Sequence, residues 1–253
     1  MSTLASRTAG VALTAAALVG TLAASAAPAQ AQANRLNAGP YEISAVTGYQ
    51  WFDESAALDG APILGLQIRR TLLKMFTAGI GVAVSRPLSR GDYFPWNRQV
   101  YFSDAQHLND TTLLFEVSQR TTIATYAAEA GLRLGGAERG WWRGLSVDGT
   151  VALGRYVLWA DPERARENRR TSAIMWQLGG GARLPIGSDA ALLLRIDDVI
   201  FTNYSRDFLS LSDPLFAEDL FPNPLTTPPA KKTTIHNPRL TIGFTFVPGE
   251  ENP

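Results

Sequence analysis

The chain has 253 residues, with 23 basic and 23 acidic side chains and no cysteine. The length allows one large domain or two small ones. The lack of cysteine excludes a disulfide framework, a thiolate metal site and a lipid-modified N-terminal cysteine. Because the net charge is zero, the composition does not indicate a basic surface, and we expect no nucleic-acid partner. No motif indicates a cofactor or a bound metal.

Residues 1–33 read as an export signal. Arg7 supplies a positive start, residues 9–27 are apolar without a charge, and residues 29–33 satisfy the small-x-small rule for cleavage twice. A transmembrane anchor is the alternative, because the apolar run approaches spanning length. The cleavage pattern favours a signal peptide, which leaves a single domain over residues 34–253. No later segment is apolar enough for a spanning helix, so any membrane integration must use β-structure.

Eight segments of the mature chain alternate between apolar residues and small or polar ones, which is the period of a β-strand. In chain order they are 41–52, 62–70, 76–85, 121–134, 145–159, 171–184, 191–203 and 239–246. Segment 76–85, FTAGIGVAVS, is the strictest of them. One of its faces is continuously apolar, and the other consists of Thr77, Gly79, Gly81, Ala83 and Ser85. An apolar face opposite a small one suits lipid on one side and a crowded barrel interior on the other.

The connections between these segments alternate in length. Short ones lie near 71–75, 136–144 and 185–190, and longer ones at 53–60, 86–120, 160–170 and 204–238. Short turns at one rim and long loops at the other are typical of a membrane barrel with periplasmic termini. The sequence therefore predicts an all-β fold: an eight-stranded antiparallel up-and-down transmembrane β-barrel with long external loops 86–120 and 204–238. Ten strands is the alternative, if 98–102 and 111–119 form an extra membrane hairpin.

Three residues depart from the alternation. Arg155 and Asp198 fall on lipid-facing positions, and Leu193 falls on an inner one. We expect both charges near the strand ends by the long loops, where a charge costs less than at the bilayer midplane. A β-bulge near Asp198 would also repair the register. Aromatic residues gather near both predicted rims. They are Trp51, Phe52 and Trp159 at one rim, and Trp141, Trp142, Phe76 and Phe246 at the other.

The inward positions carry both signs of charge. They are Glu42, Arg69, Glu129, Arg133, Asp148, Arg183, Arg195, Asp197 and Arg239. An isolated buried charge is costly, and guanidinium and carboxylate groups can pair in a bidentate way. We therefore expect a lumen that is plugged by ion pairs, although the sequence does not show which acid pairs with which arginine. The alternative is a solvent-facing sheet surface.

The signal peptide, the eight alternating segments and the terminal RLTIGFTF at 239–246 resemble the small outer-membrane β-barrels of the OmpA and OmpX kind. The resemblance is architectural and has no diagnostic motif. It implies a monomer in the bacterial outer membrane, in contact with lipid and lipopolysaccharide and inserted by the barrel assembly machinery. VPGEENP follows Phe246, so a terminal-strand signal would be internal. No peptidoglycan-binding domain is expected.

Catalytic candidates are sparse. His107 and His236 are the only histidines, and both fall in predicted external loops. Hydroxyl and acid partners can be drawn for each, from Ser103, Asp104 and Asp110 for the first and from Ser210 for the second, but no spacing singles out a triad. Loop acids such as Asp161, Glu163, Asp207 and Asp213 lack calcium-loop spacing.

Two further features fit the barrel without catalysis. The run Gly179–Gly181 lacks the context of a phosphate loop and is better explained by close packing inside the barrel. An apolar cluster in the last long loop predicts a segment folded over the barrel mouth or an adhesive patch. Its members are Phe208, Leu209, Leu211, Leu215 and Phe216. The expected role is structural or adhesive; a lipid A or phospholipid enzyme, a small pore and, remotely, a soluble lipocalin-type barrel are the alternatives.

Overall fold

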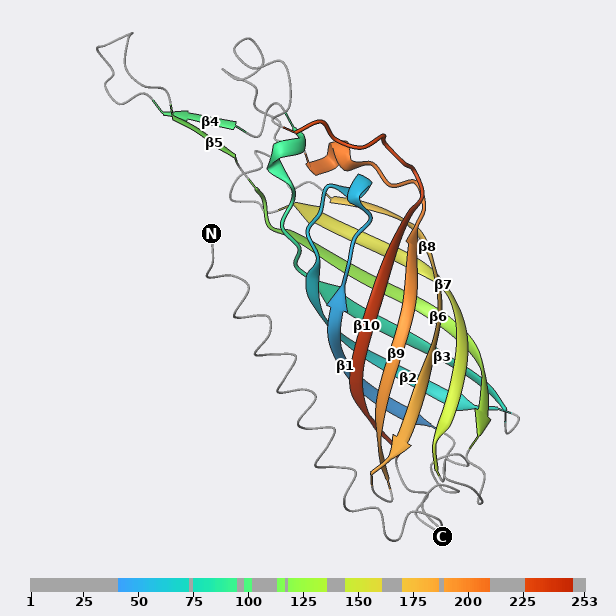
Figure 1. The fold of residues 1–253 in the computed structure, drawn as a ribbon. Coiled ribbons are helices and arrows are strands. Elements are labelled where there is room, and N and C mark those ends of the chain that lie inside the picture. Colours follow the sequence, from blue (N-terminus) through green and yellow to red (C-terminus); the bar gives the residue numbers. More distant parts are fainter. Residues whose placement is uncertain are drawn as a thin grey trace.

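In the computed structural model, the described residues are 41–72, 75–94, 98–101, 113–116, 118–135, 144–160, 170–186, 189–209 and 226–247. The predicted signal peptide therefore lies outside them, as do Trp141, Trp142, His107 and the seven-residue tail apart from Val247. Eight strands close into one barrel in the order β1-β10-β9-β8-β7-β6-β3-β2 (Figure 1). They are β1 (Glu42–Gln50), β2 (Ala61–Thr71), β3 (Phe76–Ser85), β6 (Thr121–Gly135), β7 (Ser146–Ala160), β8 (Arg170–Pro185), β9 (Ala190–Phe201) and β10 (Ile235–Phe246).

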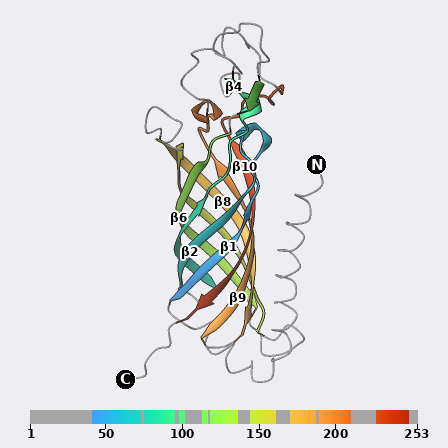
Figure 2. The ribbon, with the colours of Figure 1, turned by 90° about the vertical axis from the view of Figure 1, so that its left-hand side faces the viewer.

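Every neighbouring pair in the barrel is antiparallel, and β1 pairs with β10 to seal it. The predicted eight-stranded up-and-down barrel is thus confirmed. Following the register once around from Ile43 leads to His236, whereas Ile43 itself pairs with Phe246, ten residues further along β10. A stagger of this kind forces the strands to tilt, roughly 35–45° from the barrel axis, and the tilt is plain in Figure 2.

The hairpin that could have made ten strands stands apart from the barrel. β4 (Arg98–Tyr101) and β5 (Leu113–Glu116) form a separate two-stranded sheet. Both views place it beyond the long-loop end (Figures 1 and 2). In the described parts of the long loops, three short 3₁₀ turns lie at the same end: η2 (Glu54–Ala56), η3 (Gly91–Tyr93) and η4 (Arg206–Leu209). No helix of the described residues is long and apolar enough to cross a membrane.

Two sequence-based expectations about β9 and β10 were wrong. The last strand begins at Ile235 and not at residue 239, so His236 lies in the barrel wall and the loop that was expected to reach residue 238 ends earlier. The strand can pass through Pro238 because the Pro238 carbonyl accepts from the Trp51 amide, so the proline nitrogen faces the chain just beyond the end of β1 and no bond to β9 is lost. The β9–β10 register also runs unbroken through Asp198, without the expected bulge.

The two faces of the wall follow the alternation that the sequence predicts. On β3 the side chains of Phe76, Ile80, Val82 and Val84 are exposed on the outer face, whereas Thr77 and Ser85 are buried inside. The same inward and outward order holds around the barrel, and Leu193 is fully inside. The outer wall is consequently apolar, and the polar residues of the strands are concentrated in the lumen.

Candidate functional site

All nine charged residues that the sequence places inward are buried within the barrel. Their side chains are at most 8% exposed, and each comes from a strand. They are Glu42 on β1, Arg69 on β2, Glu129 and Arg133 on β6, Asp148 on β7, Arg183 on β8, Arg195 and Asp197 on β9, and Arg239 on β10. We call these nine residues the charged layer. They belong to the seven barrel strands other than β3, whose inward side is small.

At the short-turn end of the charged layer, one carboxylate serves two arginines. Arg133 donates from Nη1 and Nη2 to the two oxygens of Glu42, at 2.7 and 2.9 Å. Arg183 Nη1 donates to Glu42 Oε1 at 2.7 Å. Arg133 also lies 4.0 Å from Asp148, which connects this group to the next one. A bidentate pair of this kind fixes both side chains in the lumen.

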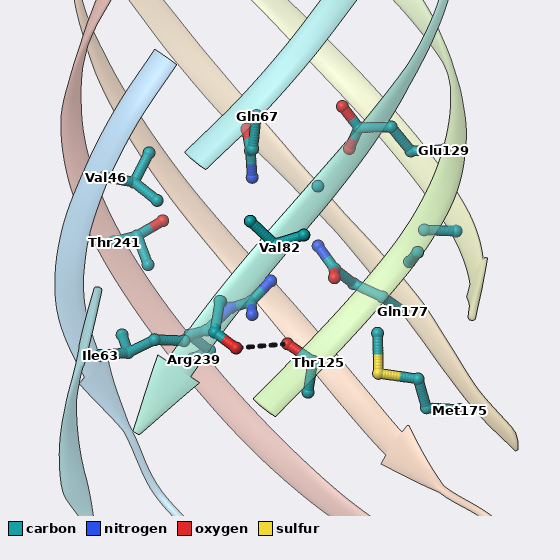
Figure 3. Close-up of a pocket in the computed structure, with 14 residues that line it drawn as sticks. Val46, Ile63, Gln67, Val82, Thr125, Glu129, Met175, Gln177, Arg239 and Thr241 are labelled. Atoms are coloured by element: carbon teal, nitrogen blue, oxygen red, sulfur yellow. Dashed lines mark hydrogen bonds between the residues drawn. The ribbon is translucent and has the colours of Figure 1, made fainter. Parts of the chain in front are cut away.

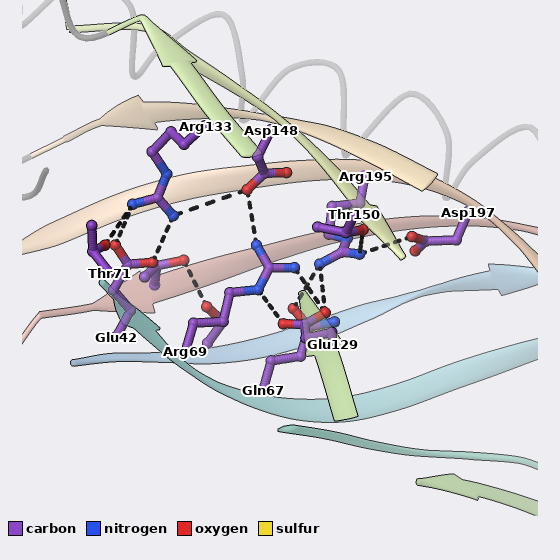
Figure 4. A network of polar contacts seen from close by, with 12 residues as sticks. Glu42, Gln67, Arg69, Thr71, Glu129, Arg133, Asp148, Thr150, Arg195 and Asp197 are labelled. Carbon is purple, nitrogen blue, oxygen red and sulfur yellow. Dashed lines mark hydrogen bonds and ion pairs between the residues drawn. The ribbon is translucent and has the colours of Figure 1, made fainter. Parts of the chain in front are cut away.

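The series continues toward the long loops (Figure 4). Arg69 donates to Asp148 at 2.9 Å and forms a two-pronged pair with Glu129. Arg195 reaches Glu129 at 3.5 Å and Asp197 at 2.9 Å, and it also donates to the hydroxyl of Thr150. Arg239 completes the series with a 3.3 Å contact to Asp197.

The order of the ion pairs is strictly alternating. From the short-turn end it reads Arg183, Glu42, Arg133, Asp148, Arg69, Glu129, Arg195, Asp197, Arg239. Each carboxylate has an arginine on either side. Such mutual pairing is what allows ionised groups to remain buried, because an unpaired buried charge carries a desolvation cost of several kcal/mol, roughly.

Glycines opposite the charged residues make room for these side chains. Gly79 pairs in register with Arg69, and Gly181 pairs with Arg195. A Cβ atom at Gly181 would lie 2.7 Å from Cγ of Arg195, and one at Gly79 would lie 2.9 Å from Cγ of Arg69. These distances are too short for a real side chain. Gly79 on β3 and Gly181 on β8 therefore leave room for two arginines of the charged layer.

A second group of buried residues, at the long-loop end of the lumen, was predicted only in part, through the apolar cluster of the last long loop. It is a buried hydrophobic cluster to which both strands and loops contribute, and we call it the apolar layer. Its members are Ala56, Ala57, Leu58, Tyr93, Phe94, Ile123, Tyr156, Leu158, Met175, Val199, Phe201, Tyr204, Leu209 and Ile235.

Aromatic contacts and tyrosine hydrogen bonds organise the apolar layer. The rings of Tyr156 and Phe201 stack with their centroids 4.2 Å apart. The hydroxyl of Tyr204 donates to the carbonyl of Ala56 at 2.7 Å, which ties the last long loop to the first. Burial raises the pKa of the Tyr204 phenol above its ordinary value. Leu209 is completely buried, so the described part of the predicted apolar loop cluster folds over the barrel mouth.

A cavity of about 20 Å³ lies inside the barrel, between the charged residues and the apolar ones (Figure 3). Its polar lining comes from Gln67, Thr125, Gln177, Arg239 and Thr241, together with Glu129 of the charged layer. A space of this size holds about one water molecule.

The outer wall carries one polar pair near the long-loop end. His236 Nδ1 lies 2.6 Å from Oδ2 of Asp198, and the side chains are 58% and 37% exposed. Asp198 faces outward as the sequence predicts, but its partner histidine was expected in a loop. Arg155 is likewise exposed on the outer face of β7. The hydrogen bonds of the described residues connect the His236 ring to Asp198 alone.

Several other candidates fall outside the described residues. They are His107, Ser103, Asp104, Asp110, Ser210, Asp161, Glu163 and Asp213. Asp207 is described, and it pairs with Lys231 at 2.7 Å on the loop surface. Among the residues that the structure describes, no three acids or histidines gather as metal ligands would.

No protein-family model and no curated protein matches the chain. Among solved structures it is similar to Neisserial surface protein A, with 7% identity, a TM-score of 0.49, and 82% of this chain and 97% of that chain covered. Ail, the attachment invasion locus protein of Yersinia pestis, matches with 10% identity and a TM-score of 0.37, over 82% of this chain and 99% of that one. The N-terminal β-barrel domain of Pseudomonas aeruginosa OprF matches with 14% identity and a TM-score of 0.33, over 81% of this chain and 96% of that one.

The closed eight-stranded barrel has the architecture of the small outer-membrane barrels of the OmpA and OmpX kind, as the sequence resemblance implies.

Proposed function

We propose that the protein is an exported barrel of the bacterial outer membrane, with a plugged, non-conducting lumen and a structural or adhesive role carried by its loops. The observation that carries this proposal is the inverted distribution of polarity. Nine charged side chains are buried inside the barrel, whereas large apolar side chains are exposed around its outer wall. A soluble ligand-binding barrel needs the opposite arrangement.

The outer wall supports lipid contact directly. Leu64 on β2 and Ile196 on β9 are 67% and 65% exposed, and comparable side chains follow on the other strands. An apolar surface of this extent would aggregate in water, but it matches the hydrocarbon of a bilayer. Phe76 and Phe246 are exposed at the short-turn end, and Tyr49 and Trp51 toward the long-loop end, as in the aromatic girdles of membrane barrels.

This arrangement also defines the proposed partners and orientation. The short turns face the periplasm, and the long loops face outward among lipopolysaccharide head groups. The barrel assembly machinery inserts the chain after the signal peptide has been removed, and the barrel functions as a monomer.

Fractionation of cells that express the full chain tests the membrane assignment. We expect the mature protein in the outer-membrane fraction, with a mobility on gels that changes on boiling, because a closed barrel resists detergent until it is heated. Recovery of the protein in the soluble periplasm would refute the proposal.

Conductance tests the plugged lumen. The purified barrel in a planar bilayer should give a flat trace, because paired charges and packed apolar residues fill the described lumen. Arg133→Ala and Arg195→Ala each remove one side chain from the charged layer and serve as comparisons. Steady channels in the wild type that widen in these variants would establish a small pore instead.

The β4–β5 sheet is the part of the loops best placed for adhesion, since it lies beyond the barrel end (Figure 1). Replacing residues 95–117 with a short turn should leave the heat-modifiable barrel intact and reduce attachment of expressing cells to host cells or surfaces. Unchanged attachment would show that this loop does not mediate adhesion.

The pair of His236 and Asp198 favours a second candidate, an enzyme that acts on lipid A or phospholipid at the outer rim. A carboxylate that holds one imidazole nitrogen leaves the other free to act as a base. If this function is correct, cells that express the protein should contain altered lipid A or phospholipid, and cells that express His236→Ala should not. An unchanged lipid profile on expression and on deletion of the protein would exclude it.

A further inference from the structure

We propose that the cavity beside Arg239 binds one small monovalent anion of the size of chloride. The proposal concerns the interior of the barrel and holds whichever role the loops have. It rests on three features of the lumen: an excess of one positive charge, the position of that excess and the chemistry of the cavity wall.

The charge balance of the lumen is unequal. The inward-facing residues of the eight barrel strands comprise five arginines and four carboxylates, which leaves one positive charge without a counter-charge. Arginine stays protonated in proteins, so the imbalance is not removed by loss of a proton. A net charge held away from water is costly, and a bound counter-ion would offset that cost.

We assign the excess charge to the Arg239 end of the series, because that end is the more weakly paired of the two. The alternating series begins and ends with an arginine, Arg183 at one end and Arg239 at the other. Arg183 contacts Glu42 at 2.7 Å. Arg239 contacts Asp197 at 3.3 Å, and Arg195 holds the same carboxylate more closely, at 2.9 Å.

Arg239 also has an unused donor. Its side chain is 5% exposed, and its Nε atom is buried without a hydrogen-bond partner among the described residues. Arg133, Arg183 and Arg195 have unpartnered nitrogens as well, but Arg239 is the one arginine in the cavity lining. A buried N–H that has lost its water without gaining an acceptor is a binding determinant for an anion.

The cavity wall adds neutral donors to this charge. Thr125, Gln177 and Thr241 line it together with Arg239 (Figure 3). The Thr125 hydroxyl donates to the carbonyl of Ala83 at 3.4 Å, which is at the long limit of a hydrogen bond, so it can turn toward a better acceptor. Glu129 is the one acid on the wall, and Arg69 and Arg195 both hold its carboxylate.

The size of the cavity sets the class of anion. About 20 Å³ accommodates one particle of roughly the size of water, such as a halide ion. Sulfate, phosphate and organic anions such as gluconate are too large. The cavity lies inside the barrel, so the halide is supplied while the barrel folds.

Refolding in different salts tests the proposal. The full mature chain is folded from urea into detergent with sodium chloride, sodium bromide or sodium gluconate at equal ionic strength, and its thermal midpoint is measured. A halide present at several times its dissociation constant should raise the midpoint by about 2–4 °C over gluconate, with a saturable dependence on concentration. Equal midpoints in all three salts would overturn the proposal.

Crystals grown in bromide give a direct measurement. We expect an anomalous peak in the cavity within hydrogen-bonding distance of Arg239, and a water molecule at that position would contradict the assignment. Ala152 is buried and lines the cavity, so Ala152→Val fills the space and leaves the ion pairs in place. This variant should fold and lose the halide dependence.

Two arginine variants separate the ends of the series. Arg239→Gln should lose the halide dependence, and Arg183→Gln, which removes the same charge far from the cavity, should keep it. If Arg239→Gln does not fold, Ala152→Val decides the question alone. Halide dependence that survives in Ala152→Val would place the ion elsewhere and refute the site.

Discussion

The charged layer and the apolar layer fill one lumen by different means. Every member of the charged layer comes from a strand, and its position follows from the alternation of that strand. The apolar layer combines strand residues such as Phe201 with loop residues such as Ala56 and Leu209. The strands alone therefore build the filling at the short-turn end, whereas the filling at the long-loop end exists only once the loops have folded into the mouth.

The two layers also differ in how they respond to loss of one member. In the charged layer each side chain neutralises its neighbours, so removing one leaves uncompensated charge. In the apolar layer removal leaves a void whose cost depends on how far the surroundings relax. Three substitutions in the two layers test this contrast, and a fourth on the loop surface provides a reference.

The largest effect is expected from Glu42→Gln. The variant leaves Arg133 and Arg183 without the carboxylate that they share, and the free energy of unfolding should fall by about 3–5 kcal/mol. Urea titration of the folded barrel in detergent measures it. Arg155→Gln, on the exposed outer face, is the matched control and should change the same quantity by less than about 0.5 kcal/mol. Equal effects of the two would show that the charged layer does not depend on its pairing.

Leu209→Ala tests the loop contribution to the apolar layer. The side chain is completely buried, and its truncation should cost about 2–4 kcal/mol in the same titration. Leu88→Ala removes an equal volume from an exposed loop position and should cost much less. A negligible effect at Leu209 would mean that the loops do not stabilise the barrel mouth.

Tyr204→Phe gives a smaller, pH-dependent effect. Loss of the hydrogen bond to the Ala56 carbonyl should cost about 1 kcal/mol at neutral pH. Because burial raises the pKa of Tyr204, the wild type keeps its full stability below the ordinary tyrosine pKa of about 10 and loses it as the pH rises further. The free energy of unfolding, measured by urea titration between neutral and alkaline pH, should therefore fall less steeply with pH in the variant than in the wild type.

The smallest effect is expected from Lys232→Ala, outside both layers. Lys232 pairs with Asp53 at 3.0 Å on the loop surface, and both side chains remain partly exposed. Its removal should cost less than about 1 kcal/mol, and high salt should reduce the difference further. A larger loss would show that the loop surface is coupled to the apolar layer beneath it.

The wall and the charged layer were predictable because both depend on a period of two within each strand. That period identifies Glu42 and Arg69 as inward residues, but it does not identify their partners. The two are neighbours in register, yet Glu42 pairs with Arg133 and Arg183 across the lumen. Partner choice depends on side-chain reach inside a closed barrel, which local sequence does not encode.

The apolar layer and the outer-wall histidine were missed for other reasons. Loop residues such as Ala57 carry no periodic signal, although the apolar segment around Leu209 was a usable hint. His236 was placed in a loop because the last strand was expected to begin at residue 239. In the structure β10 continues back through Pro238, which lies beside the end of β1, and this is a property of the assembled sheet.

The pairing across the lumen has a consequence for the order of assembly. Glu42 belongs to the first strand, and its partners belong to β6 and β8, 91 and 141 positions further along the chain. An open sheet, still without the seam between β1 and β10, cannot bring these groups together. These long-range ion pairs therefore form only when the barrel closes. Insertion should then be cooperative and late, with a transition state of high contact order and few stable, partly inserted forms.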